Sequence, residues 1–135
     1  MKSRDTLIRL KRFQAEEKRR RVAQIEAMIA EFSRMCSDLD REIATEEQKS
    51  GNSDPAHFAY STYARAARTR RDNLNNSAGE LRTQLDEAKS QLREAQEELA
   101  KVQSLEGREK SGERIVDISR DRPDGELLTL RPAGV

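Results

Sequence analysis

The feature that most constrains this chain is an apolar seam whose members are separated by alternating steps of three and four residues. The first seam contains Val22, Ile25, Ile29, Phe32, Cys36, Leu39 and Ile43. The second contains Tyr60, Ala64, Ala67, Arg71, Leu74, Ala78, Leu81, Leu85, Ala88, Leu92, Ala95, Leu99 and Val102. Only Arg71 interrupts the apolar pattern. Such spacing, kept over several heptads, predicts long helices that pair as a coiled coil.

Composition supports a coiled coil over a compact globule. Charged residues make up 38% of the 135 residues, hydrophobic residues 34% and aromatic residues only 4%. A compact core of this size needs more apolar surface to offset the entropy of the chain. Disordered chains and coiled coils both tolerate such a balance. The net charge of +1 and the regular seam favour the coiled coil.

One short break divides the first hundred residues, and it predicts a turn between two helices. Gly51 suits the position after a helix end, and Asp54 followed by Pro55 suits a helix start. We predict an antiparallel coiled-coil hairpin over 1–107, built from a helix at 3–49, a turn at 50–54 and a helix at 55–106. The remaining residues, 108–135, are rich in Gly, Pro, Ser and charge and are predicted to form a flexible, disordered tail.

Two further observations shape the predicted hairpin. The stretch 72–79 has poor helix propensity, but the seam passes through it in phase, so we predict one continuous helix there. The short turn forces antiparallel pairing, and we place Ile43 opposite Tyr60.

Charge is distributed unevenly along the chain in a way that favours this pairing. Residues 1–22 carry a net +6 and 80–106 a net −3, whereas 23–50 carry −4 and 54–79 carry +2. Antiparallel pairing within the chain sets each basic stretch beside an acidic one. A parallel homodimer would instead set stretches of the same charge beside each other. Charge therefore selects the orientation of the helices.

Residues that carry chemistry are scarce, which predicts a non-catalytic protein. The chain has one histidine, His57, and one cysteine, Cys36, which lies on the seam and behaves there as a small apolar residue. No metal-ligand spacing and no phosphate-binding loop is present. We expect no catalytic residues, no bound metal and no cofactor. No apolar run approaches ~18 residues, so we expect a cytoplasmic protein without membrane insertion.

The basic N-terminal stretch allows two interpretations. Its arginine-rich runs ahead of a heptad seam are typical of basic zippers that bind nucleic acid, but Glu16 and Glu17 interrupt them. We therefore favour an acidic protein partner. Leu7, Leu10 and Phe13 lie out of register with the seam. We expect these turns to bury a different face, against a partner.

Aromatic residues cluster near the turn. Tyr60 belongs to the seam and fits a role in closing the coil, with Leu39 and Ile43 across from it. Phe58 and Tyr63 fall off the seam, and aromatic residues in such positions are good interface anchors. Both readings stay open for this cluster.

The N-terminal stretch also resembles a known family. The segment Thr6-Leu7-Ile8-Arg9-Leu10-Lys11-Arg12-Phe13-Gln14-Ala15-Glu16-Glu17-Lys18-Arg19-Arg20 is similar to the start of FliJ proteins, which have a leucine-rich basic stretch followed by a Glu-Lys-Arg run. The hairpin architecture agrees over residues 1 to about 107, whereas the tail has no counterpart.

The resemblance implies a soluble component of the flagellar type III protein export apparatus, active in flagellum biogenesis and motility. FliJ-like proteins resemble the stalk of rotary ATPases: they insert into the hexameric export ATPase and promote its assembly, contact the cytoplasmic domain of the membrane export gate, and assist export chaperones. The resemblance assigns contacts only by region of the hairpin and not by matched residues. The end that would face the ATPase contains Arg9, Lys11, Arg12, Lys18 and Arg19. A gate contact would involve Leu39, Ile43, Phe58, Tyr60 and Tyr63. The chain would then associate peripherally with the membrane-embedded apparatus.

Three alternatives stay open at this point. The equivalent stalk protein of a virulence-type secretion system has the same sequence character. A nucleic-acid-binding coiled coil would show strongly salt-dependent affinity for DNA. An adaptor coiled coil without a link to an ATPase would have the same helix content.

Overall fold

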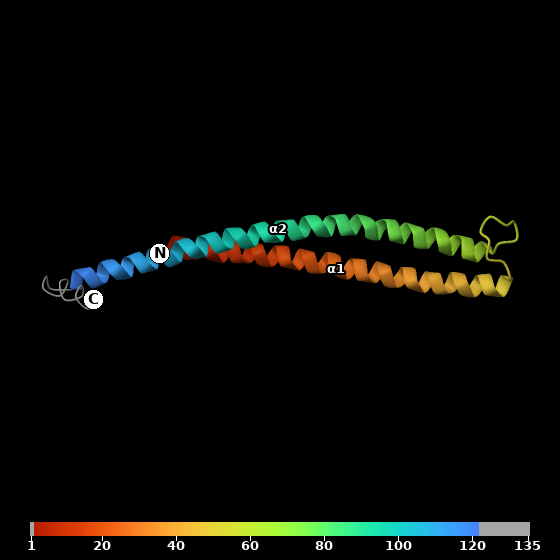
Figure 1. Ribbon diagram of the computed structural model, residues 1–135, viewed down its shortest axis with the longest axis horizontal. Coiled ribbons are helices and arrows are strands. Elements are labelled where there is room, and N and C mark those ends of the chain that lie inside the picture. Colours follow the sequence, from red (N-terminus) through yellow and green to blue (C-terminus); the bar gives the residue numbers. More distant parts are fainter. Residues whose placement is uncertain (1, 122–135) are drawn as a thin grey trace, which may run out of the picture. The chain divides into compact units, whose positions relative to one another are not determined.

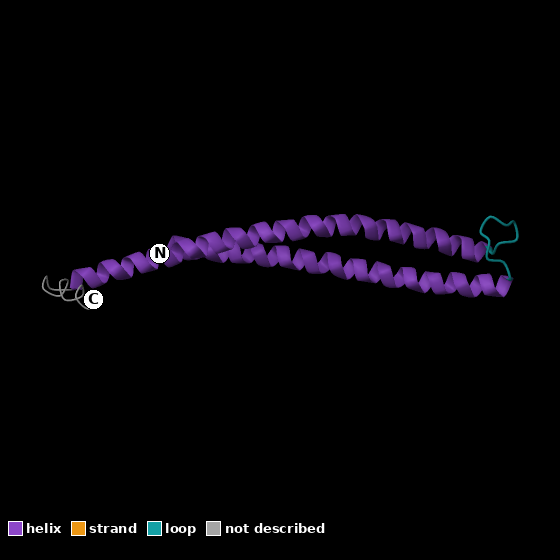
Figure 2. Ribbon diagram, in the orientation of Figure 1, coloured by secondary structure: helices purple, strands orange, loops and turns teal. Residues whose placement is uncertain are grey.

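The computed structural model describes residues 2–121, which form two long helices, α1 (Lys2–Ser50) and α2 (Thr62–Asp121). A loop at 51–61 joins them, drawn in teal in Figure 2. The two helices pack antiparallel, so the predicted all-α helical hairpin is confirmed. The chain divides into two compact units, Glu16–Glu94 and the pair of segments Met1–Ala15 with Ala95–Val135. Each unit is described by itself below.

Within 16–94, α1 and α2 run side by side in opposite directions (Figure 1), and the predicted seam forms the core. One cluster centres on Val22, Ile25, Leu81 and Ala88. A second joins Leu39, Ile43 and Ala67 and packs against Leu74. Every seam member of this unit is buried or half-buried. α2 is unbroken through 72–79, which confirms the continuous helix predicted from the phase of the seam.

The end of α1 follows the prediction, but the start of α2 does not. Gly51 has φ of +73° and donates its N–H to the Glu47 carbonyl at 3.0 Å, the left-handed end that glycine favours. Asp54 accepts from the Ala56 N–H at 3.0 Å, as a cap would, yet the following residues form turns. The helix begins at Thr62 because Ser61 caps it: the Ser61 hydroxyl accepts from the Ala64 N–H at 3.2 Å.

The longer loop changes the register of the pairing. Cys36 donates its S–H to the Arg71 carbonyl at 3.7 Å, and Lys18 donates to Gln91 at 3.4 Å. The predicted register placed Cys36 opposite Ala67 and Ile43 opposite Tyr60, about one helical turn away. That part of the prediction is wrong because α2 begins at Thr62 and not at residue 55.

Ion pairs between the helices follow the predicted charge pattern. In the unit 16–94, Arg71 Nη1 lies 3.0 Å from Asp40, and this pairing explains how an arginine fits on the seam. Hydrogen bonds to Asp40, and then to Asp72, raise the pKa of Arg71 and keep it charged. In the other unit, Lys11 Nζ lies 2.8 Å from Glu98, and Arg4 pairs with Glu109. Each exposed pair contributes only a few tenths of a kcal/mol, so the pairs select orientation.

In the unit formed by 2–15 with 95–121, the frame of the first seam continues back to Ala15, Lys11 and Ile8, where Lys11 interrupts the apolar pattern. Ile8 is buried, and Lys11 and Ala15 are half-buried. α2 runs on past Gly107 and Gly112 to Asp121, because a glycine inside a helix costs only about 1 kcal/mol. Residues 108–121, predicted as part of a flexible tail, are therefore helical. The rest of that predicted tail, 122–135, lies outside the described residues.

Candidate protein-binding surfaces

One face of α1 near its start carries apolar side chains that the hairpin leaves uncovered. Phe13 is 57% exposed and Leu10 is 49% exposed, whereas Ile8 between α1 and α2 is buried. At about 100° per residue, Leu10 lies about 160° and Phe13 about 140° around the helix from Ile8, so both face away from the side that Ile8 occupies. Arg9 and Arg12 are exposed as well, about 40° and about 100° around the helix from Phe13 and on the other side of it from Leu10. We name these four residues, Arg9, Leu10, Arg12 and Phe13, the outer face.

The structure separates the five basic residues that the sequence grouped together. Lys11 and Lys18 lie half-buried against α2, where they donate to Glu98 and Gln91. Arg19 binds Glu16 of its own helix at 2.6 Å. Among the described residues, neither Arg9 nor Arg12 makes a hydrogen bond or ion pair, so both guanidinium groups are available to a partner. Lys18 and Arg19 also belong to the unit 16–94, not to the unit of the outer face.

The Lys11–Glu98 pair has a defined electrostatic effect. The hydrogen bond from Lys11, followed by its charge, lowers the pKa of Glu98 from the ordinary 4.5. The pair therefore stabilises the folded state above pH 4.5, and that contribution is lost as the pH falls through the lowered pKa. Lys11 thus serves the pairing of the two helices in this unit.

Of the five residues proposed for partner contact near the loop, some lie in the core and others on the surface. Leu39, Ile43 and Tyr60 are buried within the hairpin, as the seam predicted for Tyr60. Phe58 is 94% exposed and Tyr63 is 56% exposed. Of the five residues that the sequence proposed for contact near the turn, these two are the ones that the folded chain presents to a partner.

Tyr60 is the residue that closes the coil. Its hydroxyl donates to Glu47 at 2.6 Å, and the guanidinium of Arg65 lies 5.3 Å from the centre of its ring. Burial, and then the hydrogen bond to Glu47, raises the pKa of the Tyr60 phenol above 10.0. A buried ring with its polar tip satisfied is the structural role that a seam aromatic is expected to take.

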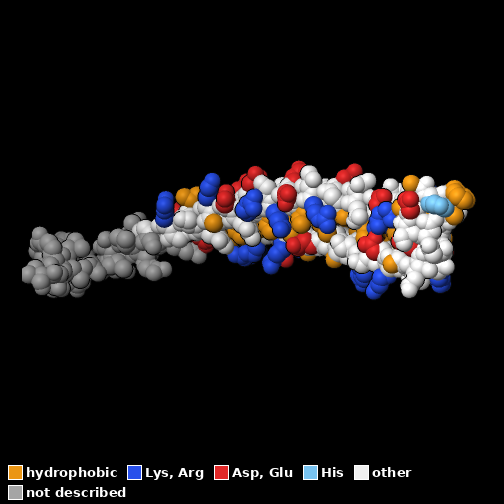
Figure 3. Space-filling model, turned by 45° about the vertical axis from the view of Figure 1, so that its right-hand side comes forward, with side chains coloured by type: hydrophobic (Ala, Val, Ile, Leu, Met, Phe, Trp, Pro, Cys, Tyr) orange, Lys and Arg blue, Asp and Glu red, His pale blue; other side chains and the backbone are white. Residues whose placement is uncertain are grey.

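The loop holds Phe58 in an exposed position through local contacts. The rings of His57 and Phe58 stack with their centres 4.7 Å apart. His57 lies in this loop and not in the first turn of α2, and its Nδ1 accepts from the Ala59 N–H at 3.0 Å. Figure 3 shows apolar side chains beside the single pale blue histidine. The ring of Phe58 is therefore supported from one side and free on the other.

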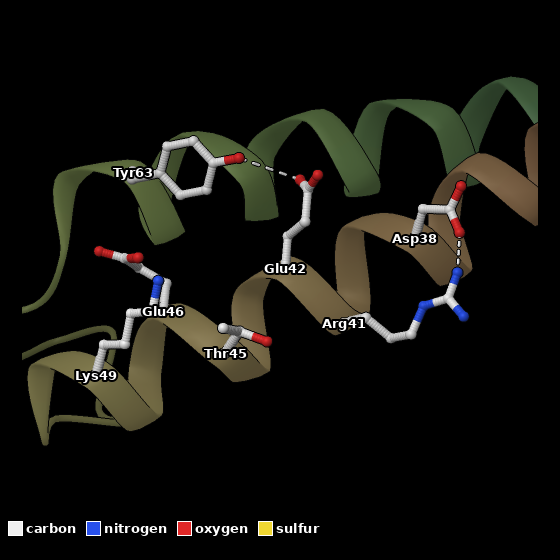
Figure 4. A pocket seen from close by; sticks show the side chains of 7 residues that line it. All are labelled: Asp38, Arg41, Glu42, Thr45, Glu46, Lys49 and Tyr63. Carbon is white, nitrogen blue, oxygen red and sulfur yellow. Dashed lines mark hydrogen bonds and ion pairs between the residues drawn. The ribbon is translucent and has the colours of Figure 1, made fainter.

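An open groove of about 720 Å³ lies between α1 and the start of α2, and Figure 4 shows its lining. It is lined by Asp38, Arg41, Glu42, Thr45, Glu46, Lys49 and Tyr63. The Tyr63 hydroxyl donates to Glu42 at 3.2 Å, and the Glu42 charge raises the pKa of Tyr63. Asp38 pairs with Arg41, and Glu46 accepts from Ser61. These acids are therefore bound by neighbouring groups of the hairpin.

Metal-binding clusters and membrane-spanning helices are both absent from the part of the chain that the structure describes. Over 2–121, no three His, Cys, Asp or Glu side chains come close enough together to hold a metal ion. No helix in this range has an apolar stretch long enough to cross a bilayer.

Comparison with known proteins leaves the family open. No family model, curated protein or solved structure matches the chain. The resemblance of residues 6–20 to FliJ proteins therefore stays a prediction, and the surfaces described above are the basis for assigning a function.

Sequence reasoning missed three residues that matter to these surfaces. Ser61 was overlooked as the cap of α2 because Asp54 and Pro55 form a stronger starting signal. Leu105 is half exposed, and its position off the seam could have revealed it. Glu98 was treated only as part of an acidic stretch, whereas the heptad frame could have placed it beside the seam, within reach of Lys11.

Proposed function

We propose that this protein is a non-catalytic, cytoplasmic component of the flagellar type III export apparatus that binds the hexameric export ATPase. The observation that carries the proposal is the outer face: two exposed apolar side chains flanked by two unpaired arginines on a helix that another helix supports. A helix with apolar anchors fits an apolar groove of a partner, and arginine and phenylalanine are favoured at such interfaces. The resemblance of residues 6–20 to FliJ proteins supports the choice of partner.

The remaining parts of the proposal follow the same resemblance. Phe58, exposed and supported by His57, is the proposed contact with the cytoplasmic domain of the membrane export gate. Export chaperones are proposed as further partners, without an assigned surface. The protein acts by association and holds no metal or cofactor in this proposal. The stalk protein of a virulence-type secretion system is the nearest alternative, since it would use the same type of surface.

The test measures the ATP hydrolysis rate and the oligomeric state of the cognate flagellar export ATPase, with and without the full chain at substoichiometric ratios. We expect the rate to rise as hexamers form. Arg9→Glu with Arg12→Glu should abolish the rise, because an acidic partner surface would then meet like charge. Arg41→Glu with Lys49→Glu, in the unit 16–94, serves as the matched control. An unchanged rate and no binding by the wild-type chain would remove the export assignment.

A further inference from the structure

A second surface of the unit formed by 2–15 with 95–121 is defined by two ion pairs between the helices. Lys11 pairs with Glu98, and Arg4 pairs with Glu109. Arg4 and Lys11 are seven residues apart, and Glu98 and Glu109 are eleven apart. Both spacings return to nearly the same side of a helix. The two ion pairs therefore lie on one flank of this unit.

Two exposed leucines lie between these ion pairs. Leu7 is three residues after Arg4 and four before Lys11, and it is 40% exposed. Leu105 is seven residues after Glu98 and four before Glu109, and it is 50% exposed. Helical spacing thus puts both leucines on the flank of the ion pairs. An apolar centre with a charged rim is the usual anatomy of a protein interface.

The charges on this flank are arranged so that it complements itself. α1 contributes the two cations, Arg4 and Lys11, and α2 contributes the two anions, Glu98 and Glu109. A two-fold axis parallel to the helices sets α1 of one copy against α2 of another. Each cation then meets an anion, and Leu7 meets Leu105. An axis perpendicular to the helices, in the plane of the interface, would instead set cation against cation.

We propose that this flank, Arg4, Leu7, Lys11, Glu98, Leu105 and Glu109, docks a second copy of the chain about a two-fold axis parallel to the helices. The same patch serves both copies, as in the commonest class of symmetric dimer. The apolar centre is small and exposed ion pairs contribute little each, so the dimer is weak and concentration-dependent. Phe13 lies about 120° and Leu10 about 60° around α1 from Leu7, so this flank adjoins the outer face without including it.

Sedimentation equilibrium of the full chain tests the association. Between about 10 and 500 µM we expect the mean mass to rise from monomer towards dimer. Leu7→Ser combined with Leu105→Ser should keep the chain monomeric throughout this range. The matched control is Met28→Ser, which removes an equally exposed apolar side chain of the other unit and should leave the rise unchanged. Circular dichroism checks that each variant keeps its helix content. A wild-type chain that stays monomeric at every concentration overturns the proposal.

Disulfide formation between chains that carry a cysteine at different positions tests the orientation of the two-fold axis. In a Cys36→Ala background, chains with Leu7→Cys are mixed with chains with Leu105→Cys and oxidised gently. The parallel axis predicts mixed disulfide dimers, with few dimers from either chain alone. Leu7→Cys chains that link mainly to each other, or a mixture that forms no links, contradict this orientation.

Discussion

Replacing Ile25 by alanine lowers the free energy of unfolding by about 3 kcal/mol. Ile25 is 1% exposed, the largest fully buried side chain among the described residues, and it lies in the cluster with Val22, Leu81 and Ala88. Alanine there removes apolar contact and leaves a cavity that two helices cannot easily close. Urea unfolding followed by circular dichroism measures the change.

Two comparisons make this result specific to the core. Ile25→Val removes a single methyl group and should cost about 1 kcal/mol, which keeps the experiment informative if the alanine variant does not fold. Met28→Ala, three residues along the same helix but 41% exposed, should change the stability by no more than about 0.5 kcal/mol. Equal effects at positions 25 and 28 would show that the core does not lie on the predicted seam.

Replacing Leu10 and Phe13 together by serine weakens binding to the export ATPase by at least about 30-fold, corresponding to about 2 kcal/mol. Both side chains are about half exposed in the free chain, so their loss should leave the folded hairpin almost unchanged. The affinity is measured by isothermal titration calorimetry with the assembled ATPase.

The matched control for this double variant is Met28→Ser with Phe58→Ser, which removes two exposed apolar side chains away from the outer face. We expect the control to bind like the wild type. Equal loss in both variants would indicate that general surface hydrophobicity, and not the outer face, determines the affinity.

Much of the fold was predictable because the information is local. A seam repeating in steps of three and four identifies both helices and the residues between them, and the seam members from Val22 to Val102 are buried or half-buried as expected. Gly51 marks the end of α1 because few other residues tolerate its backbone conformation. Charge complementarity predicts the orientation since it compares whole stretches and does not depend on single contacts.

The register was not predictable from the same signals. It depends on where α2 begins, and two candidate caps, Asp54 and Ser61, lie seven residues apart, a full heptad that leaves the seam in phase. Both satisfy a backbone N–H in the structure, but only Ser61 is followed by helix. Propensity at a single position could not decide between them.

The candidate surfaces were predictable only in part. Sequence showed that Leu10 and Phe13 depart from the seam, and that Phe58 and Tyr63 do so as well. It grouped Lys11 and Lys18 with Arg9 and Arg12 because all are basic, although the first two face α2. Distinguishing them requires knowing which side of α1 packs, and the frame of the seam before Val22 falls on Lys18 and Lys11, which do not mark a buried face by themselves.

The most direct test of the proposed function places a photoreactive phenylalanine analogue at Phe13 in one chain and at Phe58 in another. Each chain is mixed with the assembled export ATPase, irradiated and analysed by mass spectrometry. The outer-face proposal predicts covalent adducts between position 13 and the ATPase, and none from position 58. Adducts from position 58 alone, or from neither position, would contradict the proposal that this protein binds the ATPase through the first turns of α1.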